Sequence, residues 1–118
     1  MSQHAGLTLE RWMSFGLDRQ ILMIANEMNR GSSLLGPDVA QRLRNTYERV
    51  LALVDLTVRA NDSRALRREL LRWRGLVGEL YVAPAGNASA HTAALRAVLQ
   101  FTPVASAQIP HLVAPGTG

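Results

Sequence analysis

Residues 63–82, SRALRRELLRWRGLVGELYV, decide the fold of this chain. Large apolar residues recur in this stretch at steps of four, three, four and three, namely at Leu66, Leu70, Trp73, Val77 and Leu80. This spacing places them on one stripe of an α-helix. A single helix cannot bury its own stripe, so other segments of the chain have to cover it. The stretch therefore predicts an all-α fold.

Two earlier stretches repeat the same periodicity. After a short helix capped by Thr8, one helix presents the stripe Leu17, Ile21, Ile24, Ala25 and Met28 and stops at residues 31–33. The next begins at residues 36–38, where a proline and an acid suit a first helical turn, and extends to about residue 60. Its stripe consists of Val39, Leu43, Tyr47, Val50, Val54 and Val58. The short turn at residues 61–63 makes this helix and the 63–82 helix antiparallel neighbours.

The sequence changes character after residue 83, because Arg96 is the only charged residue from there to the end. Asn87 or Ser89 could cap a fourth helix, whose many alanines leave it only a thin apolar stripe. We expect residues 1–6 to be a loose tail. We also expect residues 103–118, which include three prolines, to be irregular, with Ile109, Leu112 and Val113 packed on the bundle. The prediction is one domain over residues 1–118, a small antiparallel bundle of three strong helices plus a weaker fourth.

Composition restricts the possible functions. The 118 residues are 47% hydrophobic and 19% charged, as is usual for one globular domain. There is no cysteine, which excludes disulfides, thiolate nucleophiles and cysteine-bound metals. Neither a signal peptide nor a membrane-spanning apolar run is evident, so we expect a cytoplasmic protein without membrane contact.

All 13 basic residues are arginines, and the formal net charge is +4. A basic set made of arginine alone is typical of a GC-rich genome. Arg64, Arg68 and Arg72 nevertheless follow one another on the side of the 63–82 helix opposite its apolar stripe, where they could contact phosphates. Glu69 and Glu79 interrupt this face, and no exposed aromatic residue is placed to stack on bases. A basic accessory subunit that contacts nucleic acid is therefore the alternative hypothesis.

The titratable residues do not form a recognisable catalytic motif. None of the histidines, His4, His91 and His111, has a second ligand at a metal-binding spacing, so we expect surface histidines, no metal and no cofactor. Asp55 lies about 100–120° from the centre of its stripe, and we expect a solvated or boundary residue, with Arg59 four positions on in the favourable order for an ion pair. Glu27 belongs to the most site-like polar cluster, NEMNR at residues 26–30, and could pair with an arginine of another helix. We expect no enzyme.

Several apolar residues fall outside the stripes, and these are Leu22, Met23, Leu56, Leu71 and Leu76. A monomer of this size needs few such residues outside its core, and an exposed apolar patch marks a contact surface. The sequence therefore favours a non-enzymatic protein–protein interaction module that either self-associates or serves as an accessory subunit of a larger complex.

Overall fold

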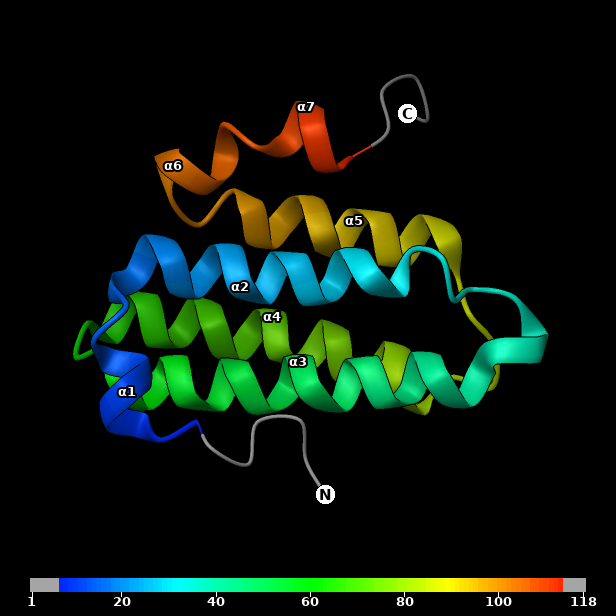
Figure 1. Cartoon of the computed structure of the whole chain (residues 1–118), viewed down its shortest axis with the longest axis horizontal. Helices are drawn as coiled ribbons and strands as arrows, with labels where there is room; N and C mark the ends of the chain where they lie inside the picture. Colours follow the sequence, from blue (N-terminus) through cyan, green and yellow to red (C-terminus); the bar gives the residue numbers. More distant parts are fainter. Residues whose placement is uncertain (1–6, 114–118) are drawn as a thin grey trace.

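The computed structural model describes residues 7–113, and this part of the chain is helical without any strand (Figure 1). The elements are α1 (Leu9–Met13), α2 (Gly16–Gly31), a 3-10 turn η1 (Pro37–Val39), α3 (Ala40–Ala60), α4 (Arg64–Val82), α5 (Ala88–Leu99), α6 (Pro103–Ser106) and α7 (Ile109–Leu112). The four long helices α2 to α5 form the bundle, and each runs opposite to the one before it (Figure 1). The predicted all-α fold is confirmed.

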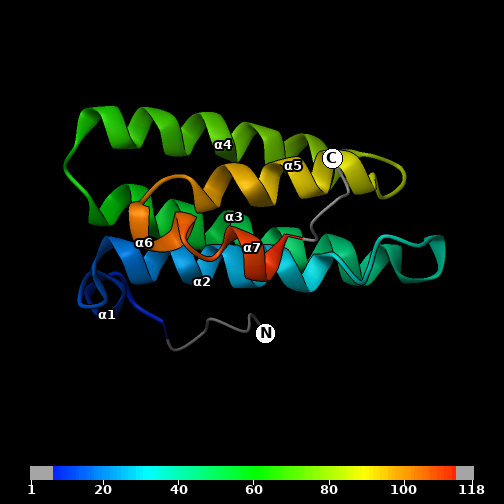
Figure 2. The ribbon, with the colours of Figure 1, turned by 90° about the horizontal axis from the view of Figure 1, so that it is seen from above.

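The four long helices close into a ring around one core. Helix α3 packs against α2 and α4, and α5 packs against the same two helices from the other side. Seen from above, α5 lies beside both α4 and α2, and the segment that contains α6 and α7 runs lengthwise above the bundle (Figure 2). The sides α2–α3 and α4–α5 are therefore opposite faces of the bundle.

The core is made of the predicted stripes. Their central residues are almost fully buried, among them Ile21, Ile24, Met28, Leu43, Tyr47, Val50, Val54, Leu70, Trp73 and Val77. Trp73 is 3% exposed, and its indole Nε1 donates a hydrogen bond of 2.9 Å to the carbonyl oxygen of Ala94 in α5. Helix α5 adds Leu95, Val98 and Leu99 to the core, so it contributes more than its sequence suggested.

A corner between α1 and α2 closes one end of the bundle. Thr8 caps α1 as predicted, because its hydroxyl accepts a bond of 3.1 Å from the Arg11 N–H. Ser14 does not cap α2, since its hydroxyl instead donates to the Arg11 carbonyl oxygen. Gly16 turns the chain with a φ of +75°, a conformation that side chains with a Cβ rarely adopt.

This corner is fastened to α3 by Trp12, which is completely buried. The Trp12 indole Nε1 donates to the Thr57 hydroxyl at 2.9 Å, and that hydroxyl donates to the Leu53 carbonyl oxygen at 2.8 Å. The Gln20 side chain in α2 donates to the Trp12 carbonyl oxygen at 2.9 Å. Buried polar groups thus hold three helices together at one point.

The prediction that residues 103–118 are irregular was wrong for residues 103–113, the part of this segment that the structure describes. Residues 103–106 and 109–112 form the one-turn helices α6 and α7. Helix α6 begins at Pro103, which suits a first helical turn. Thr102 caps this helix, because its hydroxyl accepts a hydrogen bond of 3.1 Å from the Ala105 N–H. Val113 is 4% exposed, and Ile109 and Leu112 pack against the core, as expected. Residues 1–6 and 114–118 lie outside the described residues.

Replacing Thr57 by valine keeps the shape of the side chain and removes the acceptor of the Trp12 indole. We expect Thr57→Val to lower the free energy of unfolding by about 1–3 kcal/mol, because a buried donor is left unpaired. Urea denaturation measures this. The matched control is Thr92→Val on α5, which removes no side-chain bond found in the described residues and should change stability by less than about 0.5 kcal/mol. Equal stability of Thr57→Val and the wild type would contradict the anchoring role of this bond.

Candidate functional site

The predicted interaction surface does not exist as one patch. Leu22, Met23 and Leu56 are only partly exposed and pack against the core. Leu71 and Leu76 are exposed, at 52% and 46%. They are five residues apart, which separates them by about 140° around α4, so they lie on different flanks of that helix. The residues outside the stripes thus divide into core-flanking side chains and two separate exposed leucines.

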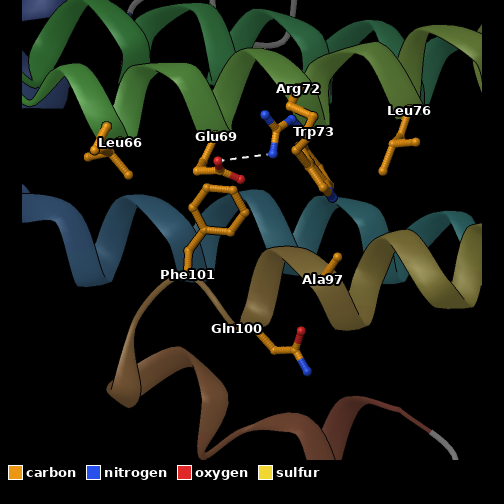
Figure 3. Close-up of a pocket in the computed structure, with 9 residues that line it drawn as sticks. Leu66, Glu69, Arg72, Trp73, Leu76, Ala97, Gln100 and Phe101 are labelled. Atoms are coloured by element: carbon orange, nitrogen blue, oxygen red, sulfur yellow. Dashed lines mark hydrogen bonds and ion pairs between the residues drawn. The ribbon is translucent and has the colours of Figure 1, made fainter.

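Leu76 belongs to a groove of about 550 Å³ between α4 and α5. The groove is lined by Ala65, Leu66, Glu69, Arg72, Trp73, Leu76, Ala97, Gln100 and Phe101. In Figure 3, Leu66, Trp73 and Leu76 project from α4 toward α5, while Phe101 projects back toward α4 from just beyond the end of α5. The Gln100 side chain points away from α4. The groove therefore has an apolar floor.

The polar groups of the groove are few. Arg72 Nη1 donates to Glu69 Oε1 at 3.2 Å, and this pair lies on the α4 side (Figure 3). Both side chains are more than half exposed, so the ion pair contributes little to stability. The small Ala97 side chain points from α5 toward Trp73 (Figure 3). Such a surface offers apolar contact with one charged edge, formed by Glu69 and Arg72.

The arginine face of α4 is partly neutralised. Arg72 is paired with Glu69, whereas Arg64 and Arg68 are exposed and have no carboxylate partner within residues 7–113. Two flanking arginines are occupied as well, since Arg67 donates to the Asn61 carbonyl oxygen and Arg74 binds Asp55. The predicted phosphate-contacting residues therefore lie on one exposed face, but only two of them are unpaired there.

Asp55 is solvated, as expected, with its side chain 52% exposed. Its predicted partner was wrong. Both carboxylate oxygens accept from Arg74 of α4, at 2.7 and 3.1 Å, rather than from Arg59. The two-point bond to Asp55 raises the pKa of Arg74 further above its usual range. The pair links α3 to α4, and nothing in its exposed position suggests catalysis.

Glu27 is buried, with 7% exposure, and it holds two guanidinium groups. Arg49 Nε, from α3, donates to Glu27 Oε2 at 2.9 Å, and Arg30 Nη1 donates to Glu27 Oε1 at 3.2 Å. The pairing with an arginine of another helix is therefore found. Sequence reasoning did not single out Arg49, because a partner 22 positions away leaves no local signal.

The prediction that His91 lies on the surface was wrong, because the structure buries this residue completely. Its Nε2 lies 2.8 Å from the Met28 carbonyl oxygen, which can only accept, so Nε2 carries the proton. Nδ1 then accepts from the Tyr47 hydroxyl at 2.7 Å. Burial lowers the pKa of His91 and raises the pKa of Tyr47 to about 12. This closed pair is structural, since no solvent or substrate reaches it.

The other histidines contribute no site. His111 is exposed, and His4 lies outside the described residues. No group of three or more potential acidic or histidine metal ligands occurs within residues 7–113. In the same part of the chain, none of the helices combines the length and the hydropathy that a membrane crossing requires.

The stability of the bundle should depend on pH through His91. Unfolded His91 takes up a proton near pH 6.5, and the folded residue does so only at lower pH, so the unfolded state binds more protons between these values. The free energy of unfolding should therefore fall as the pH drops below 6.5, by up to about 1.4 kcal/mol per pH unit. Urea denaturation at several pH values measures this. In His91→Gln this contribution should vanish, and an NMR titration of His91 at or above pH 6.5 would contradict it.

Comparison of the chain with family models, with curated proteins and with solved structures yields no match, so only the geometry above bears on its function.

Proposed function

We propose that this chain is a non-enzymatic helical interaction module, an accessory subunit that takes an amphipathic helix of a partner protein into the groove between α4 and α5. The observation that carries the proposal is the groove itself, an apolar channel of about 550 Å³ with Leu76 exposed along it. Contiguous exposed apolar surface with a polar edge is typical of contact sites. The absence of cysteine is compatible with a cytoplasmic setting.

The dimensions of the groove favour a helix as its occupant. Leu66 and Leu76 line it ten residues apart on α4, which corresponds to about 15 Å along the helix axis. That length accommodates about three turns of a docked helix, enough for apolar side chains at positions i, i+3 and i+7. Between them, Trp73 and Phe101 form the floor against which such side chains would pack.

The charge of α4 favours an acidic partner over a second copy of this chain. Helix α4 carries five arginines and two glutamates, and Arg64 and Arg68 have no carboxylate partner in the described chain. The groove of a second copy would offer one carboxylate, Glu69, which Arg72 already holds, so a second copy would bring no acid for Arg64 and Arg68. A partner helix with acidic residues beside its apolar stripe would instead pair with them. We therefore commit to a heterologous helix.

A matched pair of variants tests the groove. Leu76→Glu places a charge in the groove, and Leu71→Glu places the same charge at a similarly exposed position of α4 outside it. A photo-crosslinking residue at position 76, with one at 71 as control, would first capture the partner. Calorimetry with the purified partner should then show at least about tenfold weaker binding for Leu76→Glu and nearly unchanged binding for Leu71→Glu.

Three results would contradict the proposal. Equal weakening by both variants would show that the groove is not the contact. A dimer in sedimentation velocity that Leu76→Glu dissociates would assign the groove to a second copy. Binding of DNA or RNA at low salt that is lost when Arg64, Arg68 and Arg72 are changed to glutamine, without a protein partner, would favour the nucleic-acid alternative.

A further inference from the structure

A second cleft, of about 420 Å³, is lined by residues from the C-terminal end of α2 and the N-terminal half of α3. Figure 1 shows the end of the bundle at which these two helices are joined. Three arginines line the cleft, Arg30 from α2 and Arg42 and Arg49 from α3, together with the polar residues Ser33, Asn45 and Thr46. It belongs to the α2–α3 side of the bundle, opposite the groove between α4 and α5. Its chemistry is also different, since hydrogen-bond donors replace the apolar floor.

Glu27 holds two of these arginines in place from below. Each of its carboxylate oxygens accepts from one guanidinium, Arg49 Nε at 2.9 Å and Arg30 Nη1 at 3.2 Å. Arg49 is fixed further, because its Nη2 donates to the Thr46 hydroxyl at 3.2 Å and its side chain is only 20% exposed. The Nη1 group of Arg49 has no partner within the described residues. The cleft is therefore lined by a guanidinium that is ordered before any ligand arrives.

The positive charge of the cleft exceeds what the protein neutralises. Three guanidinium groups stand against the single carboxylate of Glu27, which leaves a net charge of +2 at the cleft. Arg42 is exposed and forms no ion pair within residues 7–113, not even with Asp38 four positions before it. An anion in the cleft would complete this charge balance.

The position of Arg42 is unfavourable for the isolated helix. It lies in the first turn of α3, at the positive end of the helix dipole, where a cation is unfavourable. The dipole accounts for Arg30, which lies in the last turn of α2. It does not account for Arg42. A negatively charged ligand would form an ion pair with Arg42 and would interact favourably with the positive N-terminal end of α3.

We propose that the cleft formed by Arg30, Arg42 and Arg49 binds the phosphate group of a small phosphorylated molecule. Guanidinium groups donate paired hydrogen bonds that match the oxygens of a phosphate. Ser33 and Asn45 add polar contacts at the same cleft. A volume of about 420 Å³ accepts a phosphate and a short organic group, but it is confined to one end of the bundle and does not form a track for a nucleic-acid backbone.

An NMR titration of the full chain tests this site. Inorganic phosphate, or glycerol phosphate in a second arm, is added at constant ionic strength and neutral pH, with sodium chloride as the balancing salt. The arginine Nε–H signals of Arg42 and Arg49 should shift saturably. Arg42→Gln should weaken the affinity at least about tenfold, because a bond to a charged group is lost. Arg59→Gln, which removes the same charge from the other end of α3, should leave the affinity nearly unchanged.

The two arms distinguish the sources of the phosphate. Tighter binding of glycerol phosphate would assign the site to a phosphate ester, and equal binding would assign it to the phosphate group alone; both results support the site. Absence of a saturable shift in both arms would overturn the proposal. Equal loss of affinity in Arg42→Gln and Arg59→Gln would do the same, since it would indicate general charge attraction. Shifts seen only with an oligonucleotide would replace the site by a nucleic-acid surface.

Discussion

The structure depends on how the apolar stripe of α4 is covered. A stripe of large side chains on one helix is stable only when neighbours remove it from water, and α3 and α5 do this from two sides. Opposite Trp73, helix α5 carries the small residues Ala94 and Ala97, and the Ala94 carbonyl oxygen accepts from the Trp73 indole. The same small side chains leave space next to Leu66, Leu76 and Phe101. The closed core and the open groove thus have one cause.

Polar side chains fix the ends of this apolar bundle. Trp12 and Thr57 fasten the α1 corner, and the Tyr47–His91 pair joins α3 to α5 and, through the Met28 carbonyl oxygen, to α2. Each of these buried groups has a partner, which avoids the cost of leaving donors or acceptors unpaired. Glu27 differs, because it is buried but holds arginines that face a cleft. The Tyr47–His91 pair is therefore structural, whereas the arginines held by Glu27 line a candidate binding site.

Local signals in the sequence predicted the helices well. The stripes of α2, α3 and α4 follow from a period of 3.6 residues, and Thr8, Ser63 and Asn87 each cap a helix through a neighbour three positions away. The Thr102-Pro103 pair is a similar local signal for the start of α6. All of these features depend only on residues close together in the chain.

Features that join distant residues could not be predicted. His91 is buried because Gly31 leaves room for it, and a Cβ at Gly31 would lie 2.7 Å from the imidazole. Neither residue indicates the other in the sequence. Likewise, Arg74 and Arg49 each form an ion pair with a carboxylate on a different helix, Asp55 and Glu27 respectively. The groove in turn depends on which side of α5 faces α4. The period of a stripe gives the buried face of a helix, but it does not give the neighbour that covers it.

The central claim is that the small side chain of Ala97 in α5 leaves an open groove beside Leu76 and beside Leu66, at one end of the buried stripe of α4. Ala97 faces the groove, so Ala97→Leu adds apolar volume at that point (Figure 3). The most direct measurement is the free energy of unfolding of Ala97→Leu by urea denaturation. The account predicts a gain of about 0.5–2 kcal/mol, because the new side chain fills the groove and covers apolar surface. A loss of stability would show that the α4–α5 contact is already closely packed, and would contradict the claim.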